Sequence, residues 1–106
     1  MPLSDFLMPG EEIKFLSSRH VKYGTKRYQL VLSDRRILLY ARRGMMFKND
    51  DVVTQKLEDL QGVKYTEQGM IDKRGIIKVQ THKTEMDLSG PAADMKALYQ
   101  QMMQFM

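Results

Sequence analysis

Basic side chains gather at two places in the first half of the chain, and they are the residues best suited to binding chemistry. The two groups are Lys22, Lys26, Arg27 and then Arg42, Arg43, Lys48. Lysine and arginine recognise carboxylates, phosphates and anionic lipid head groups. The second group encloses the apolar residues Met45, Met46 and Phe47 in the sequence RRGMMFK. An apolar tip between cations suits a membrane surface; the alternative is that the tip extends a strand or folds into the core, with the cations merely solvated.

Residues that commonly catalyse reactions or bind metals are sparse. Cysteine is absent, which removes thiolate nucleophiles, thiolate metal ligands and disulfides. His20 and His82 are the only histidines, and their spacing matches no metal-ligand pair. The sequence contains neither a glycine-rich phosphate loop nor a nucleophile elbow. We therefore predict that the protein is not an enzyme and that it binds no metal and no cofactor.

The net charge of +4 comes from the first half of the chain. Residues 1–50 carry 10 Lys/Arg and 5 Asp/Glu, whereas residues 51–106 carry 7 and 8. This charge is low for a surface that follows nucleic-acid phosphates, so nucleic acid is disfavoured as a partner. No apolar stretch approaches the roughly 20 residues that span a bilayer, and no secretory signal is recognisable. We predict a cytoplasmic protein, or one peripheral to the inner face of the membrane if it binds lipid.

Turn-forming residues recur about every ten positions, and runs rich in Ile, Val, Leu, Tyr and Phe separate them. This pattern predicts antiparallel strands over residues 12–22, 26–33, 36–42, 51–56, 63–68, 76–81 and 84–88. The last segment differs, because Met95, Leu98, Met102 and Phe105 recur at helical spacing. Ser89 or Gly90 would cap this helix and Pro91 would occupy its first position. We predict one domain over residues 1–106, with a lead-in over 1–10 and a helix over 89–106.

The segment YQLVLSDRRILLY predicts a hairpin with a two-residue turn at Asp34 and Arg35. In this register Leu30 faces Leu39, and the inward face is formed by Tyr28, Leu30, Leu32, Ile37, Leu39 and Ala41. Extending the register places Arg27 beside Arg42. The first and third connections of a meander lie at the same end, so all six basic candidates would share one rim.

The other face of the hairpin carries Val31, Leu38 and Tyr40, which is more apolar than an ordinary solvated face. On the helix, Met103 and Met106 lie partly off the inward stripe. These five residues are candidates for contact with a partner protein or with a second copy of the chain.

The residues LMPGEEIKF, YQLVLSDRRILLY and KLEDLQGVKY, followed by an amphipathic helix, resemble the prokaryotic pleckstrin-homology-like domains. The matching elements are Pro9-Gly10-Glu11, Ser33-Asp34-Arg35-Arg36 and the segment from Leu57 to Val63. The resemblance implies a mainly β fold: a partly open barrel of about seven antiparallel strands in two sheets, closed at one end by the C-terminal helix. In the wider superfamily, phosphoinositide-binding members use the open end, whereas many prokaryotic members look like oligomerising or protein-contact modules.

Two functional hypotheses follow for a noncatalytic binding or assembly module. The first is self-association or contact with a partner protein through the outer hairpin face and the helix. The alternative is docking to anionic membrane lipid, or to another anionic ligand, through the basic residues at the open end.

Overall fold

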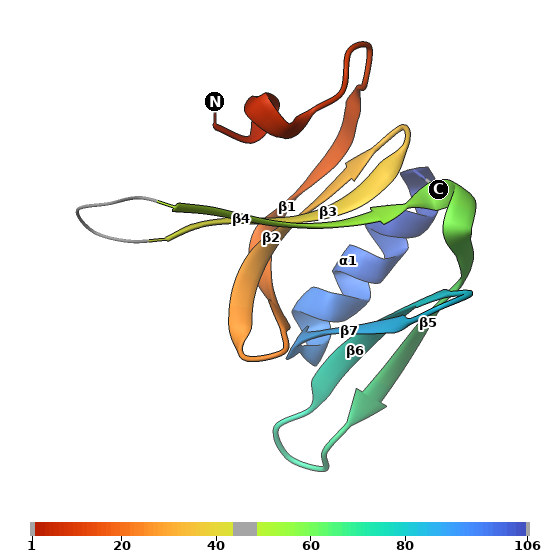
Figure 1. Cartoon of the computed structure of the whole chain (residues 1–106). Helices are drawn as coiled ribbons and strands as arrows, with labels where there is room; N and C mark the ends of the chain where they lie inside the picture. Colours follow the sequence, from red (N-terminus) through yellow and green to blue (C-terminus); the bar gives the residue numbers. More distant parts are fainter. Residues whose placement is uncertain (1, 44–48, 106) are drawn as a thin grey trace.

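The computed structural model describes residues 2–43 and 49–105, which form seven β-strands followed by one α-helix (Figure 1). The strands are β1 (Ile13–Tyr23), β2 (Lys26–Ser33), β3 (Arg36–Arg43), β4 (Asn49–Lys56), β5 (Leu60–Gln68), β6 (Arg74–Thr81) and β7 (Glu85–Pro91). The helix α1 covers Ala92–Phe105, and short 3-10 helices η1 and η2 cover Pro2–Phe6 and Leu57–Asp59. All seven predicted strands are confirmed, with shifts of a few residues at their ends.

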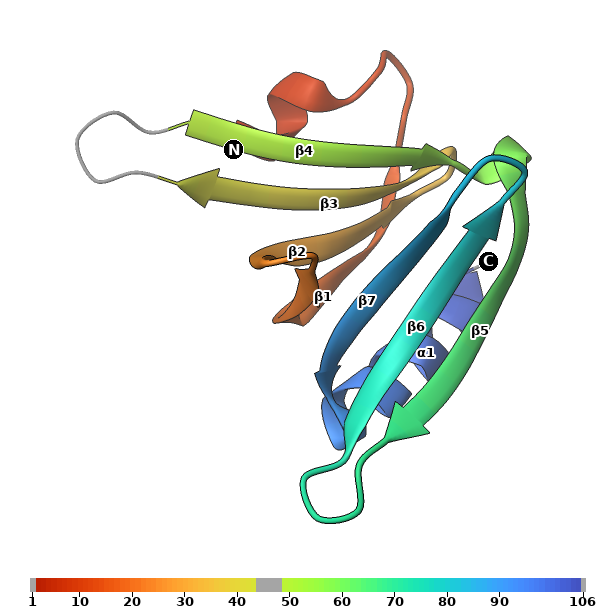
Figure 2. The same cartoon turned by 60° about the horizontal axis from the view of Figure 1, so that its bottom comes forward.

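The strands form one antiparallel sheet in the order β4-β3-β2-β1-β7-β6-β5, with β4 and β5 as free edges (Figure 2). The resemblance implied two sheets, but β1 joins both halves through the pairs Lys22↔Ser89 and Tyr23↔Leu88. Between Ile13 and Tyr23, β1 contains three more residues than the facing part of β2, at two register shifts. Such bulges bend a strand and increase its twist. The bent β1 therefore passes from one half to the other, and the sheet curls without closing.

The predicted β2–β3 register is confirmed from Gln29↔Tyr40 to Leu32↔Ile37. Leu30 pairs with Leu39 and Leu32 with Ile37. The inward residues of this hairpin are buried in a core that also includes Val21, Ile77, Val79 and Leu88, except Ala41, which is partly buried against that core. The hairpin therefore supplies one wall of the core, and β6 and β7 supply the other.

The helix lies against the concave side of the sheet, where Met95, Leu98 and Met102 are buried (Figure 1). It begins at Ala92 rather than at residue 89, because Pro91 still pairs with Arg74 as the last residue of β7. A Cβ atom added at Gly75 would lie 2.7 Å from the Cβ of Met95. The absent side chain at this position lets the first turn of the helix approach β6 closely.

The N-terminal segment covers the outer face of the β2–β3 hairpin. Leu3, which is fully buried, packs with Val31 and Leu38 in a second small core. The expectation that Val31 and Leu38 are exposed for a partner is therefore wrong, since the chain's own lead-in occupies their face. Tyr40 is half-buried at the edge of this core, and its ring lies 6.2 Å from that of Phe6.

An ion pair anchors this segment to the turn between β2 and β3. The side chain of Glu11 is fully buried and that of Arg36 is 11% exposed, and Arg36 Nη2 lies 2.6 Å from Glu11 Oε1. Arg36 also donates to the carbonyl oxygen of Phe6 at 2.7 Å, and the Ser33 hydroxyl donates to Glu11 at 2.5 Å. Arg36 therefore links the PGE and SDRR segments.

Candidate anion-binding site

The turn between β1 and β2 places two cations side by side. Gly24 has a φ of +64°, and no other residue of the turn has a positive φ, so Gly24 and Thr25 form a type II′ turn. This turn fixes the pair Tyr23↔Lys26 and, one step further, the pair Lys22↔Arg27. Directly opposed residues share a face of the sheet, so Lys22 and Arg27 project from the same side.

A third cation reaches this face from β6. Lys22 pairs with Ser89 of β7, and Ser89 pairs with Ile76 of β6. Arg74 lies two residues before Ile76 and therefore projects from the same face. Lys22, Arg27, Arg74 and Ser89 line one open pocket on the convex side of the sheet. We call Lys22, Arg27 and Arg74 the basic rim.

One carboxylate, that of Asp87, lines the pocket and also lies near a lysine outside the rim. This lysine, Lys78, lies 3.9 Å from the Asp87 carboxylate and 3.4 Å from that of Glu85. Within residues 2–43 and 49–105, neither Lys22 nor Arg74 has a carboxylate within ion-pair distance. Three cations and one carboxylate therefore line this pocket, and the Ser89 hydroxyl adds a hydrogen-bond donor beside them.

Two further basic candidates, Lys26 and Arg42, do not join the rim. The β2–β3 pairing ends at Gln29↔Tyr40, so the predicted Arg27–Arg42 contact is wrong. Beyond that point Arg42 pairs with Asp50 of β4, and its Nε lies 3.6 Å from the Asp50 carboxylate. Lys26 lies 3.9 Å from Asp51. The β3–β4 hairpin, which carries Arg42, diverges from the β1–β2 turn (Figure 1).

Several candidates cannot be placed. Lys48, Met45, Met46, Phe47 and Met106 lie outside the described residues, and so does the side chain of Arg43. The apolar tip predicted at residues 45–47 therefore stays a prediction.

A different apolar tip is described between β5 and β6. The side chains of Met70 and Ile71 are 95% and 94% exposed. This loop and the β1–β2 turn lie at the same end of the molecule (Figures 1 and 2), and Arg74 of the basic rim follows the loop directly. The sequence contained a signal for it, because GMIDKR repeats the apolar-and-basic character of RRGMMFK.

Comparison with known proteins identifies the fold. No protein-family model and no curated protein matches the sequence. A solved structure, the crystal structure of a pleckstrin homology domain from Shewanella amazonensis, superposes with a TM-score of 0.55. The match covers 83% of this chain and 74% of that chain, at 18% sequence identity. The chain has a pleckstrin-homology-like fold. The resemblance drawn from the PGE, SDRR and LEDLQGV segments is thereby confirmed at the level of the fold.

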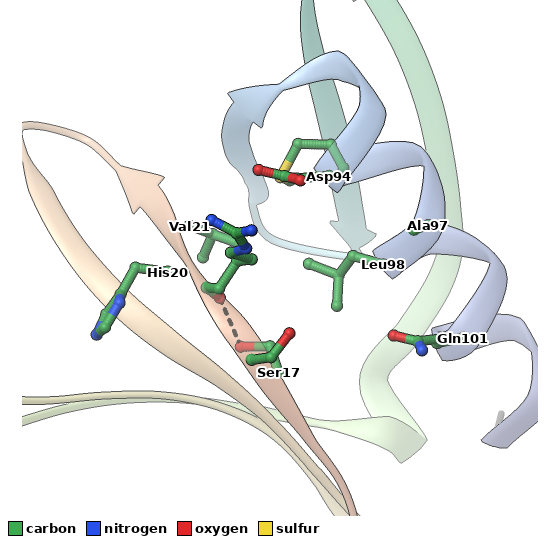
Figure 3. Close-up of a pocket in the computed structure, with 10 residues that line it drawn as sticks. Ser17, His20, Val21, Asp94, Ala97, Leu98 and Gln101 are labelled. Atoms are coloured by element: carbon green, nitrogen blue, oxygen red, sulfur yellow. Dashed lines mark hydrogen bonds between the residues drawn. The ribbon is translucent and has the colours of Figure 1, made fainter.

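The pleckstrin-homology-like fold also contains a pocket between β1 and α1 (Figure 3). Ser17 is part of the β1 bulge, and its hydroxyl accepts the N–H of Leu30 at 3.0 Å and donates to the carbonyl of Arg19 at 2.8 Å. Asp94 and Gln101 project from the helix on the opposite wall (Figure 3). His20 points to the other side of β1 from Asp94, so the two do not form an acid–base pair (Figure 3).

Across the part of the chain that the structure describes, no cluster of three or more metal-ligating side chains is found. His82 lies in the turn between β6 and β7, where its Nδ1 is 2.8 Å from the side-chain nitrogen of Gln61. Within the same residues, no helix has the length and apolar character needed to cross a bilayer.

Proposed function

We propose that this pleckstrin-homology-like domain is a noncatalytic docking module that attaches to an anionic surface through the basic rim. The observation that carries the proposal is the convergence of Lys22, Arg27 and Arg74, from three different strands, around the Ser89 hydroxyl. The fold supports a binding module in general, and the three cations of the pocket supply the chemistry. Clustered cations with low-dielectric walls raise the local concentration of anions and speed their association.

The rigidity of the strands favours this use of the rim. Lys22, Arg27, Arg74 and Ser89 all lie on paired strands, and Lys22↔Arg27 is fixed by a two-residue turn. The backbone positions that carry the cations are therefore fixed before any ligand arrives. Binding by a positioned site does not require ordering of a loop, which lowers its entropic cost.

The test is a charge-reversal pair with a matched control. Lys22→Glu with Arg74→Glu removes the rim, whereas Lys56→Glu with Lys83→Glu makes the same change in net charge at the far end of the sheet, near the β6–β7 turn. We expect the rim variant to elute from a polyanionic phosphocellulose resin at clearly lower salt than the control variant. Equal elution of the two variants, with both folded by circular dichroism, would refute the proposal.

A second candidate function is self-association through the last turn of α1. The side chains of Met103 and Phe105 are 40% and 47% exposed there, although the ring of Phe105 stacks on Phe15. Methionine adapts readily to a second surface. Light scattering over a concentration series would show a dimer that Met103→Lys abolishes; a mass that stays monomeric throughout removes this candidate.

A further inference from the structure

The pocket between β1 and α1 is small and partly apolar (Figure 3). Its volume is about 170 Å³, which is space for roughly six water molecules at about 30 Å³ each. Val21, Met95 and Leu98 form its apolar lining, and they are only 1%, 2% and 7% exposed. Sites for drug-sized ligands are larger, at about 300 Å³ or more. The pocket therefore fits one small molecule and not a nucleotide-sized cofactor.

Two opposite charges face this pocket from different elements. Arg19 lies on β1, whereas Asp94 projects from the first turn of α1 on the opposite wall (Figure 3). Within the part of the chain that the structure describes, neither side chain takes part in an ion pair or a hydrogen bond. Asp94 is half-buried, so its carboxylate has lost part of its water without gaining a partner. A ligand that carries both charges would supply the missing partner on each wall.

The spacing of the helix residues leaves space beside the carboxylate. Asp94, Ala97 and Gln101 recur at helical intervals, so they lie along the face of α1 that borders the pocket. With a rise of about 1.5 Å per residue, Asp94 and Gln101 are roughly 10 Å apart along the helix axis. Ala97 lies between them, and its short side chain leaves this length of the helix face open. The helix thus presents a carboxylate at one end of the pocket and an amide at the other.

The opposite wall is fixed by the bulge of β1. Ser17 is buried, and its hydroxyl accepts the N–H of Leu30 at 3.0 Å and donates to the carbonyl of Arg19 at 2.8 Å. These two hydrogen bonds hold the backbone of the residue that carries the guanidinium group. A wall that is already ordered lowers the entropic cost of binding a ligand.

We propose that this pocket binds a free α-amino acid with a short aliphatic side chain. The ammonium group of the ligand would bind Asp94 and its carboxylate would bind Arg19. Its aliphatic carbons would lie against Val21 and Leu98. A simple anion would satisfy Arg19 but would be repelled by Asp94, and a simple cation would have the converse mismatch. The inference goes beyond the proposed function, since none of the residues that line this pocket lines the pocket of the basic rim.

Titration of the ¹⁵N-labelled protein, followed by two-dimensional NMR, tests the assignment with four probes. L-valine carries both charges and an aliphatic body, glycine carries both charges alone, and isobutylamine and isobutyrate carry one charge each. We expect L-valine to shift the amide signals of Ser18, Ala97 and Gln101 saturably and to leave that of Lys83 unchanged. Glycine should bind about tenfold more weakly or less, since it removes no aliphatic carbon from water. Each single-charge probe should also bind about tenfold more weakly or less, because it leaves one wall without a partner.

Two conservative substitutions remove one charge each. Asp94→Asn and Arg19→Gln should each weaken the binding of L-valine by about tenfold or more. In Asp94→Asn, L-valine should also lose its advantage over isobutyrate, because the ammonium group no longer has a partner. Asp59→Asn and Lys83→Gln are the matched controls, since they make the same changes in charge at exposed residues of a different pocket. Both controls should bind L-valine as the parent protein does.

Three results would overturn the inference. The first is the absence of saturable shifts with L-valine, or shifts that lie outside the pocket. The second is equal affinity for L-valine and isobutyrate in the parent protein, which would leave a carboxylate site without a role for Asp94. The third is binding of L-valine that persists in both Asp94→Asn and Arg19→Gln, with each variant shown to be folded by its NMR spectrum.

Discussion

Replacement of Glu11 by glutamine should lower the free energy of unfolding by about 3 kcal/mol. The Glu11 carboxylate is fully buried, lies 2.6 Å from Arg36 Nη2 and 2.9 Å from Arg36 Nε, and accepts the backbone N–H of Met8 at 2.9 Å. Glutamine keeps the shape but not the charge, so the guanidinium of Arg36 would stay buried without its counter-ion. Removing one partner of a buried ion pair typically costs about 3–5 kcal/mol.

The pKa of Glu11 leads to a similar magnitude. The hydrogen bond from Arg36 lowers this pKa to about 2 from an ordinary value of 4.5, against the opposing effect of burial, with smaller lowering from Ser33 and Met8. Each pKa unit corresponds to about 1.4 kcal/mol of differential interaction, which gives roughly 3 kcal/mol for the charged form. Against a total stability of about 5–15 kcal/mol for a domain, this loss is large.

The sign of the pH dependence follows from the lowered pKa. The folded protein holds the ionised carboxylate more strongly than the unfolded chain does, so the contribution is fully present above about pH 4.5. It is lost as the pH falls from there towards about 2. The difference in stability between the parent protein and Glu11→Gln should therefore shrink as the solution is acidified through this window.

Urea unfolding followed by circular dichroism, at a series of pH values from neutral to acidic, measures both effects. Glu12→Gln is the matched control, because the side chain of Glu12 is 73% exposed and its partner Lys14 is 3.4 Å away at the surface. An exposed pair of this kind contributes little. The reasoning is wrong if the two variants lose the same stability at neutral pH, or if their difference does not change on acidification.

Two further substitutions test the packing. Gly75→Ala should lower the free energy of unfolding by about 1–3 kcal/mol and reduce the thermal midpoint, since its Cβ would lie 2.7 Å from that of Met95. Gly62→Ala is the control, because the nearest atom to its Cβ would be 3.6 Å away. If the two variants lost the same stability, the close approach at Gly75 would be contradicted. Leu3→Ala should lower the free energy of unfolding by about 2–5 kcal/mol. It should also raise the fluorescence of a dye that binds apolar surface, because the N-terminal segment would cover the hairpin less tightly. Met8→Ala, at a residue that is 40% exposed, should change neither the stability nor the dye fluorescence.

The strands and their local register could be predicted from the sequence because both depend on short-range patterns. The pairing of Leu30 with Leu39 follows from alternation on either side of a two-residue turn, and a shift of one residue would move every apolar side chain to the other face. The helical stripe of Met95, Leu98 and Met102 is equally local. Such patterns place residues relative to their near neighbours in the chain.

The covering of the outer hairpin face depends on contacts that no local pattern encodes. Val31 and Leu38 correctly indicated that the outer face of the hairpin packs against another group, because an apolar face of this kind is stable only when it is kept from water. The cover is Leu3 on the short helix η1, and a 3-10 segment of five residues has too few turns to show a periodic stripe. The same applies to Glu11 and Arg36, which lie 25 positions apart and meet only after the lead-in has folded over the turn.

Arg74 shows the same limit at the candidate site. It joins Lys22 and Arg27 because β7 pairs with both β1 and β6, so its position depends on two non-local pairings in succession. The predicted rim was instead built by extending one hairpin register past its end. Arg42 instead pairs with Asp50 of β4 and lies outside the rim.

The bulges of β1 explain why one end of the molecule carries the site. Three extra residues bend the strand, and at the largest bulge the Ser17 hydroxyl accepts the N–H of Leu30 in place of a ladder partner. Beyond that bend, β1 and β2 turn away from β3, and only then does Lys22 come beside Ser89 of β7. A straight β1 would keep Arg27 next to Arg42 and far from Arg74. Because of the bend, Arg27 lies near Arg74 and not near Arg42. The cations of the rim therefore lie at the end of the sheet where Met70 and Ile71 protrude.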